Sequence, residues 1–505
     1  MIIRLFRFIS YACVGLLACV VAATQTFAAQ PRHGMSPKLV VGPKETRDAA
    51  PSGVAGTYHI FTCQRGVSVG QCYDPYQMRH AYGIDSQIAA GYDGTGRTIV
   101  IVDAFDYPAI PNVVPGLDAD FAAFNTLYGL PAATINHVYP DGVPGFDSGW
   151  AGEMALDVEW AHAIAPGAKI VLVHAITNED SDILSAIKYA VDHNLGDVIS
   201  MSFGDNESCV GSALLASYHD VFAAATEKGI TLFASSGDEG AALPTCDGDS
   251  WEKAVSSPAS DPLVTAVGGT ELRAADYPTA CTDTTMPGCA FSAVSPTPGT
   301  YQSEIAWNED GAFGDFPGAL GGTTIATGGG FSVLFDAPPW QKSIPGGKAR
   351  AVPDVAYNGA VLHGVLGILF GQCCFRFGGT SAGSPQWAAI TAIADQKAGG
   401  RLGFLNSAIY QIGRVNNAYP VSFHDVTLGT NSSSQEDANG DDVVVNGFSA
   451  GSSWDATTGL GSPMQGSLVD NLIRYVSPGD GQAAISTTKP KNNPKPVVPG
   501  HMDTH

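Results

Sequence analysis

Hydrophobic and polar residues alternate along the middle of the chain with two different periods. Near-continuous runs rich in Val and Ile predict buried strands over 97–106, 169–175, 197–203, 230–238 and 263–269. Apolar residues recur at helical spacing over 152–165, 181–193 and 213–229. Buried strands separated by amphipathic helices predict an α/β fold, with a parallel sheet flanked by helices on both faces. Active sites of such folds lie at the carboxyl ends of the strands, where SMSFGD (200–205) and ASSGDEG (234–240) stand.

The composition fits a large enzyme. The chain has 505 residues, of which 45% are hydrophobic and 14% are charged, enough for one large core or two smaller ones. Its 60 Gly and 32 Pro residues follow no period, which favours a loop-rich enzyme over a fibrous protein. The net charge of -23 at pH 7 disfavours nucleic acid and anionic membranes as partners. Self-repulsion falls in acid, because many of the carboxylates become neutral there.

The first residues have the pattern of an export signal. A basic start, MIIRLFR, is followed by the apolar stretch FISYACVGLLACVVAA and by the small residues of TFAA. We therefore expect a signal peptide over residues 1–29 and a secreted mature chain, outside the membrane and monomeric. A membrane anchor is one alternative, although the apolar run is short for a span. A lipoprotein signal at Cys19 is another, although the apolar run continues beyond this cysteine.

The rest of the chain divides into three parts. Residues 30–72 form a short N-terminal segment, 73–476 one large domain, and 477–505 a Pro/Asn/Lys-rich tail that we expect to be disordered. Eight cysteines lie beyond the signal, and an even count in an exported protein predicts disulfides. The candidates are Cys63–Cys72, Cys281–Cys289, Cys209 with Cys246 across adjacent loops, and Cys373 with Cys374 as a vicinal bridge or with separate partners.

A candidate nucleophile stands in FGGTSAGSPQW (377–387). The glycines predict a tight turn, and Pro385 falls in the first turn of the helix that follows, so that Ser381 lies at a helix start. We expect this helix to run from Ser381 to about Lys397. A serine hydroxyl is a weak nucleophile until a base takes its proton.

Histidine is the commonest base for such a serine, but the histidines offer little here. None is followed by Gly-Thr, and His162 and His363 are better explained as structural residues. The better candidates are Glu153 and Asp157 in GEMALDVEW. Four residues apart, they lie on one face of a predicted helix that is otherwise apolar, where two acids are costly unless they share a proton.

A third acid, Asp238, ends the predicted strand 230–238. An isolated Ser-Gly-Asp is a weak signal, because turns are rich in these residues. A carboxyl group that stays protonated can, however, donate a hydrogen bond to a developing oxyanion.

Together these motifs resemble the sedolisins, the serine-carboxyl peptidases with a subtilisin-like fold. GGTSAGSP is similar to their nucleophile motif, GEMALDVEWAHAIAPGA to their paired-carboxylate helix, and ASSGDEG to the segment with their oxyanion aspartate. SPASDPLVTAVGGT, TGGGFSVLFDAPPWQ and VPDVAYN follow in family order, so the resemblance covers about 73–475. It implies hydrolysis of proteins or peptides, with internal cleavage favoured over tripeptide removal.

The resemblance also implies a role for each motif residue. Ser381 would attack the peptide carbonyl, while Glu153 takes its proton and later returns it to the leaving amine. Asp157 would orient Glu153, and Asp238, protonated, would join the Ser381 N–H in the oxyanion hole. In some members the acid after the oxyanion aspartate lines the first specificity pocket. This nominates Glu239, which is equally well explained as an exposed loop acid.

A carboxylate base sets the pH of activity. The ordinary pKa of Glu is about 4, against about 6.5 for His. Glu153 must be ionised while Asp238 is protonated, so we expect activity between roughly pH 3 and 5, before local shifts, and little at neutral pH.

The family's calcium site is similar to two segments near the C-terminus, FHDVTLGTN and FSAGSSWDATTGLGSP. The resemblance implies one structural Ca²⁺ held by the Asp425 and Asp455 carboxylates and by the carbonyls of Val426, Gly451 and Ser453. Such a mixture of oxygen ligands suits calcium. Ser453 replaces a family glycine, which restricts the backbone there. The DANGDD loop between the segments is best explained as a polar loop, with a second calcium as the alternative.

Two features depart from the family. Only about 45 residues separate the predicted signal from the catalytic domain, fewer than a folded prosegment needs, which leaves the activation route open. Phe203 stands where many members have tryptophan. Two other functions stay in view: a subtilisin-like Ser-His-Asp peptidase using Asp103, and an inactive, calcium-stabilised binding protein on the same scaffold.

Overall fold

The computed structural model describes residues 34–46, 60–65, 70–277, 297–310, 323–464 and 466–491. The predicted signal with Cys19, the Cys281–Cys289 pair and the end of the predicted tail, 492–505, lie outside the described residues. Within the described ranges, no helix combines the length and the apolar character that crossing a bilayer requires.

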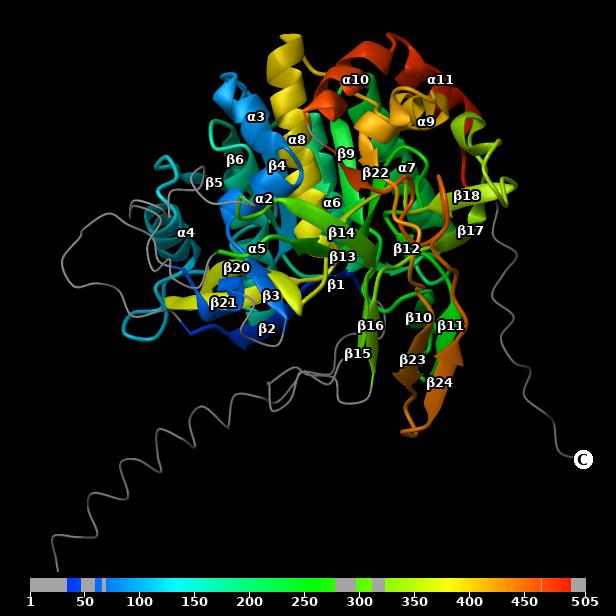
Figure 1. Cartoon of the computed structure of the whole chain (residues 1–505). Helices are drawn as coiled ribbons and strands as arrows, with labels where there is room; N and C mark the ends of the chain where they lie inside the picture. The colour runs from blue at the N-terminus through cyan, green and yellow to red at the C-terminus, as the bar shows by residue number, and fades with distance from the viewer. Residues whose placement is uncertain are drawn as a thin grey trace, which may run out of the picture.

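A mostly parallel sheet of eight strands forms the centre of the molecule (Figure 1). Its strand order is β14-β13-β9-β7-β4-β6-β5, with β19 also paired to β13. Every pair is parallel except β13 with β14. The bounds are β4 Thr98–Ala104, β5 Ile135–Val138, β6 Lys169–Ala175, β7 Val198–Met201, β9 Thr231–Ser235, β13 Thr265–Ala274, β14 Tyr301–Ala306 and β19 Val355–Asn358.

Helices cover this sheet on both faces, as the periodicity predicts. α5 (Ser148–Ile164) and α8 (Gly383–Ala398) pack together on one face, and α6 (Asp180–Asp192) and α7 (Ser212–Glu227) pack together on the other. All residues of α5 from Trp150 to Ile164 are buried, because this helix lies between the sheet and other elements. The α/β, subtilisin-like class is therefore confirmed.

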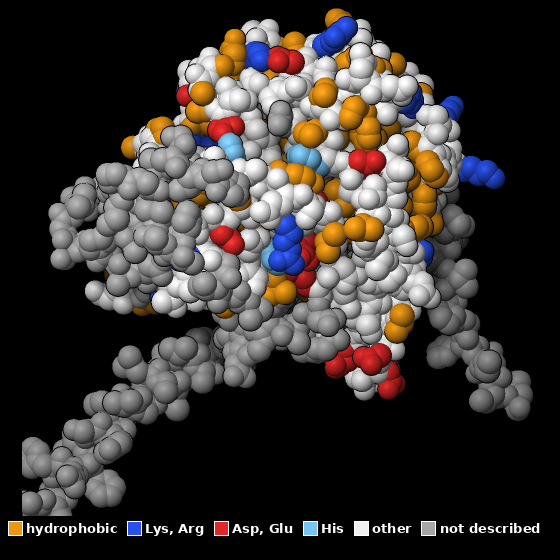
Figure 2. Space-filling view, viewed as in Figure 1, with side chains coloured by type: hydrophobic (Ala, Val, Ile, Leu, Met, Phe, Trp, Pro, Cys, Tyr) orange, Lys and Arg blue, Asp and Glu red, His pale blue; other side chains and the backbone are white. Residues whose placement is uncertain are grey.

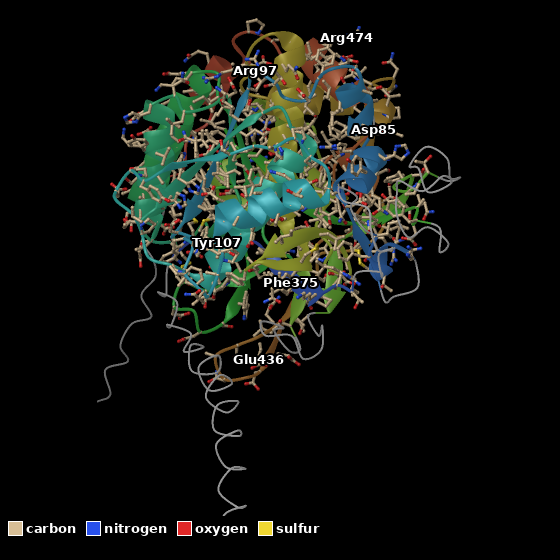
Figure 3. All side chains as sticks on the ribbon, turned by 90° about the vertical axis from the view of Figure 1, so that its left-hand side faces the viewer. Asp85, Arg97, Tyr107, Phe375, Glu436 and Arg474 are labelled. Atoms are coloured by element: carbon tan, nitrogen blue, oxygen red, sulfur yellow. A yellow bond between two sulfur atoms is a disulfide. The ribbon has the colours of Figure 1, made fainter. Side chains whose placement is uncertain are left out.

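A second sheet lies at the carboxyl ends of the parallel strands. Its order is β2-β21-β20-β3, with bounds Val40–Lys44, Gln372–Gly378, His363–Leu369 and Gln71–Tyr73. In Figure 3, Arg97, just before β4, lies at the top, Tyr107, just after β4, lies lower, and Phe375 of β21 lies below both. The carboxyl ends of the parallel strands therefore face this second sheet.

Two predicted elements differ from the structure. The strand expected over 197–203 is broken at Ser202: β7 ends at Met201, and β8 (Phe203–Asn206) joins a separate sheet, β1-β8-β12, with β1 Ser36–Pro37 and β12 Ser256–Ser257. The tail expected to be disordered from 477 instead contains α11 (Asp480–Thr487). Ala484 is buried, and the Thr488 carbonyl accepts a hydrogen bond from His219 at 2.9 Å, so tertiary contacts hold this weakly helical segment.

Three predicted disulfides are present: Cys63–Cys72, Cys209–Cys246 and the vicinal Cys373–Cys374. Acidic side chains gather at the tip of the hairpin formed by β23 (Ser433–Glu436) and β24 (Asp442–Val445), as Figure 2 shows. Asp437 there accepts the backbone N–H groups of Asn439 and Asp441 at 2.8 and 2.9 Å. The DANGDD loop thus closes on itself through hydrogen bonds.

Candidate active site

Ser381 lies in a short turn between β21 and α8. The turn begins at Gly379, whose φ of 97° is unfavourable for other residues, and continues as the 3-10 helix η3 (Thr380–Ala382). Ser381 is fully buried, and its hydroxyl donates to the Ser202 carbonyl at 3.3 Å. The nucleophile is therefore held at the break between β7 and β8.

Three buried carboxyl groups lie beside this turn. Glu153 and Asp157 project from α5, which packs against η3, and Asp103 comes from the end of β4. Burial raises the pKa of each carboxyl group well above its ordinary value. The charges of Asp157 and Asp103 raise the pKa of Glu153 further, and the Ser381 hydroxyl acts in the opposite direction. Such close acids cannot all be ionised, so the cluster must retain protons.

Two members of this cluster are not evident from the sequence. The sequence suggests Asp103 only as a member of an alternative Ser-His-Asp triad. In the structure it lies near Asp157, whose negative charge raises the pKa of Asp103. Ser202 donates its hydroxyl to Asp157 Oδ1 at 2.8 Å, while its carbonyl accepts the Ser381 hydroxyl. The position of Asp103 and Ser202 at adjacent strand ends was the only signal that could have found them.

Asp238 lies on the other side of Ser381. Its Oδ1 accepts the Thr380 N–H at 2.8 Å and the Thr380 hydroxyl at 2.7 Å, whereas its buried Oδ2 has no hydrogen-bond partner among the described residues. Burial, followed by the charge of Glu239, raises the pKa of Asp238 to about 7. Below that pH the group is protonated, so Oδ2 can act as a hydrogen-bond donor.

Glu239 lies beside Asp238 rather than in free solvent. Its Oε2 accepts the Asp238 N–H at 3.0 Å, and its carboxylate forms an ion pair with Lys38 at 3.0 Å. Only 26% of the Glu239 side chain is exposed, against 3% of Lys38. Glu239 is therefore a partly buried acid paired with a buried lysine, and not a freely exposed loop acid.

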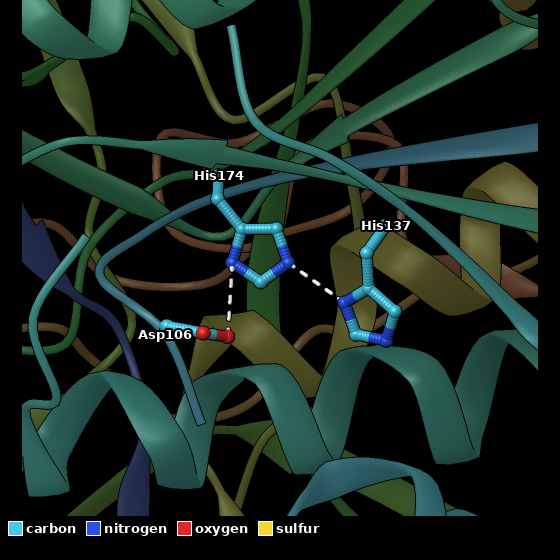
Figure 4. Close-up of side chains that lie close together, drawn as sticks. All are labelled: Asp106, His137 and His174. Atoms are coloured by element: carbon cyan, nitrogen blue, oxygen red, sulfur yellow. Dashed lines mark hydrogen bonds and ion pairs between the residues drawn. The ribbon is translucent and has the colours of Figure 1, made fainter. Parts of the chain in front are cut away.

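Among the described residues, no histidine forms a hydrogen bond to Ser381. The largest histidine cluster, with Asp106, His137 and His174, lies elsewhere (Figure 4). His174 Nδ1 bonds to the Phe105 carbonyl at 2.8 Å and lies 3.7 Å from Asp106, while its Nε2 lies 2.9 Å from His137 Nδ1. One ligand atom from each of Asp106, His137 and His174 lies within 4.8 Å of the other two, so the three residues could hold a metal ion, apart from Ser381. His162 bonds to the Pro131 carbonyl, which fits its structural interpretation.

The predicted calcium residues come together in two facing loops. Both Asp425 carboxylate oxygens accept the Ser453 N–H, at 3.0 and 3.1 Å, and Asp455 Oδ2 accepts the Gly451 N–H at 3.0 Å. Ser453 has a φ of 64°, the conformation that a glycine would favour. Val426, next to Asp425, is buried. The two carboxylates are hard oxygen ligands of the kind that calcium prefers, although backbone N–H groups already occupy several of their oxygens.

Known proteins share this architecture. The model of the Subtilase family matches residues 148–409, which is over half of the chain. Kumamolisin from Bacillus sp. (strain MN-32) is 32% identical over 420 residues, which are 80% of this chain and 64% of kumamolisin. Tripeptidyl-peptidase 1 from Mus musculus is 28% identical over 300 residues, 55% of this chain and 44% of the relative. The chain therefore spans between about two fifths and two thirds of the length of these relatives.

A solved structure gives the same result for the fold. Pseudomonas sedolisin, a serine-carboxyl proteinase in complex with two molecules of pseudo-iodotyrostatin, matches with a TM-score of 0.63 and 26% identity. The match covers 81% of this chain and 99% of that structure. With the carboxyl cluster around Ser381, these similarities show that the chain belongs to the subtilase family and, within it, to the sedolisins.

Proposed function

We propose that this chain is a serine-carboxyl peptidase that hydrolyses peptide bonds in proteins and peptides. The observation that carries the proposal is the burial of Ser381 among Glu153, Asp157 and Asp238, without a histidine in hydrogen-bond contact in the described part of the chain. Ser381 attacks the carbonyl carbon, and Glu153 takes its proton, steadied by Asp157. Asp238 and the Ser381 N–H stabilise the oxyanion. Glu153 then protonates the leaving amine, and water hydrolyses the acyl-enzyme by the reverse sequence.

The proposed mechanism requires an acidic pH for activity. Asp238 must be protonated, so activity falls as the pH rises through its pKa of about 7. Glu153 must be ionised, and burial raises its pKa well above the ordinary value, so the acid limit moves upward as well. The active range is therefore higher than the pH 3 to 5 expected from unshifted groups, and it ends near neutrality.

We favour cleavage of internal bonds over removal of N-terminal tripeptides. The N-terminal segment 34–44 extends on both sides of Ser381. It pairs with β8 on one side and with β21 on the other. A strand that continues on both sides of the nucleophile supports internal cleavage.

Two further features complete the proposal. One Ca²⁺ would be held by Asp425, Asp455 and the carbonyls of Val426, Gly451 and Ser453, where it would stabilise the two loops. The protein would act outside the cell, after export by the N-terminal signal.

Digestion of a denatured protein across pH 2 to 8 tests the function. The wild-type chain should digest it in acid, and Ser381→Ala should be inactive. Ser384→Ala is the matched control, because Ser384 lies close by at the start of α8 and its hydroxyl bonds to that of Ser200, at 2.8 Å. Equal digestion by Ser381→Ala and the wild type would refute the proposal.

A further inference from the structure

Two histidine rings meet at the carboxyl ends of neighbouring strands (Figure 4). His174 belongs to β6 and His137 to the adjacent edge strand β5, while Asp106 follows β4, on the other side of β6. His174 and Asp106 are buried, and 20% of the His137 side chain is exposed. We call these three residues the His137 cluster. The proposed peptidase mechanism uses none of them.

The outer nitrogen of each ring faces a hydrogen-bond acceptor. His174 Nδ1 lies 2.8 Å from the Phe105 carbonyl oxygen, and His137 Nε2 lies 3.3 Å from Asp118 Oδ1. A neutral ring carries one hydrogen, so it satisfies such a contact only when that hydrogen is on the outer nitrogen. The inner nitrogens, His174 Nε2 and His137 Nδ1, then turn lone pairs toward each other across 2.9 Å. Two lone pairs this close repel, and a cation between them removes the conflict.

The arrangement without a cation leaves one contact unsatisfied. His137 can place its hydrogen on Nδ1 and donate it to His174 Nε2. The lone pair of His137 Nε2 then faces the Asp118 carboxylate, which can only accept a hydrogen bond when ionised. Only a cation between the rings therefore satisfies both outer contacts at once.

A metal ion suits this position better than a proton, because Asp106 supplies a third ligand. Asp106 Oδ1 accepts the Tyr107 N–H at 2.9 Å and the Tyr139 hydroxyl at 3.4 Å, whereas Oδ2 forms no hydrogen bond within the described ranges. Two nitrogens bound to a tetrahedral zinc ion lie about 3.3 Å apart, since each bond is about 2.0 Å long. The observed 2.9 Å between the inner nitrogens is close to that separation, so a small rotation of the rings admits the ion.

The ligands also indicate the class of ion. Imidazole nitrogens combined with a carboxylate suit zinc and related transition metals, whereas calcium takes oxygen ligands. A histidine that binds a metal almost always donates its other ring N–H to a carboxylate or a backbone carbonyl. The Asp118 carboxylate and the Phe105 carbonyl are acceptors of these two kinds.

We propose that the His137 cluster binds one zinc-class metal ion, and that Asp118 and the Phe105 carbonyl position the two rings for it. The inference goes beyond the proposed function and does not depend on it. A water molecule would complete the tetrahedral shell on the side where His137 is exposed.

Such an ion would connect the ends of three strands, β4, β5 and β6. The Asp106 N–H also donates to the Gly145 carbonyl at 2.9 Å, and Asp147, two residues further on, caps α5 with its side chain. Metal binding should therefore stabilise the folded chain and, with it, the start of the helix that carries Glu153.

Calorimetric titration of the full Ser381→Ala chain with ZnCl₂ at pH 7 tests the proposal. The Ser381→Ala background prevents proteolysis during the measurement, and excess calcium in the buffer occupies sites for hard cations. We expect one zinc ion per chain and an unfolding midpoint that rises with the zinc concentration.

Variants locate the ion. In the same background, His137→Gln should weaken zinc binding at least tenfold, and Asp118→Ala should weaken it about tenfold, because His137 loses its orienting acceptor. His193→Gln is the matched control. His193 is exposed at the end of α6, where its Nδ1 bonds to the Tyr189 carbonyl at 3.0 Å, so this variant should bind zinc like its parent.

Three results would overturn the proposal. Absence of both a binding heat and a midpoint shift would mean that a proton, and not a metal, joins the rings. Equal affinities in His137→Gln and His193→Gln would place the ion elsewhere. Asp118→Ala keeps the test decisive if His137→Gln does not fold, since 72% of the Asp118 side chain is exposed. Unchanged affinity in Asp118→Ala would contradict the positioning of the rings.

Discussion

Thr380→Val should extend activity to higher pH. Thr380 gives Asp238 Oδ1 two hydrogen bonds, from its N–H at 2.8 Å and from its hydroxyl at 2.7 Å. Both bonds favour the ionised form of Asp238 and lower its pKa, but burial and the charge of Glu239 outweigh them and raise the pKa to about 7. Valine has nearly the same shape and removes only the hydroxyl, so the protonated, active form of Asp238 should persist further into neutral solution.

The magnitude follows from the loss of one hydrogen bond. A net value of about 1 kcal/mol corresponds to about 0.7 unit in the pKa of Asp238. The same change leaves Asp238 Oδ1 with a single donor and removes the hydroxyl that accepts the Gly237 N–H at 3.2 Å, which together should cost roughly 1 to 3 kcal/mol of stability. The alkaline limb of activity should therefore move upward by about 0.7 pH unit, in a protein that is slightly less stable.

The assay is kcat/KM for a peptide substrate measured from acid to neutral pH. Thr391→Val is the matched control, because Thr391 is a buried residue of α8 whose hydroxyl has no hydrogen-bond partner among the described residues. Its profile should coincide with that of the wild type. An alkaline limb that stays in place or moves downward in Thr380→Val would refute the role given to protonated Asp238.

Three further predictions concern specificity and stability. Glu239→Gln should reduce kcat/KM at least tenfold for peptides with Lys before the cut bond and leave apolar peptides less affected; equal losses would contradict a specificity role. Removing calcium with a chelator should lower the thermal unfolding midpoint of the wild type but not of Asp425→Asn, and equal midpoints in the wild type with and without chelator would argue against the metal. Asp354→Ala should cost about 3 to 5 kcal/mol in denaturant unfolding, because it strands the fully buried Arg350; an unchanged midpoint would contradict this.

Local patterns in the sequence predict the scaffold well. The Val and Ile runs over 169–175 and 230–238 become β6 and β9, because a strand buried on both faces needs apolar residues throughout. The helix with Glu153 and Asp157 was also predictable from a local pattern. Helical spacing alone places these two acids on one face.

Features that depend on distant partners were not predictable. The predicted strand is interrupted at Ser202 because β8 leaves the main sheet. It pairs instead with β1 and β12, which lie far away in the sequence. Asp103 joins the carboxyl cluster only when β4 and α5 pack together. The segment around Lys38 is short, and its two strands exist because β8 and β21 supply their hydrogen bonds.

Replacement of a single carboxylate on α5 tests the central claim most directly. Glu153→Gln and Glu159→Gln change equally buried acids of the same helix, but Glu159 bonds to the Ile368 N–H, away from Ser381. With a carboxylate as the base, kcat/KM in acid should fall about 10²- to 10⁴-fold in Glu153→Gln and remain close to the wild-type value in Glu159→Gln. Wild-type activity in Glu153→Gln would mean that another group takes the proton of Ser381.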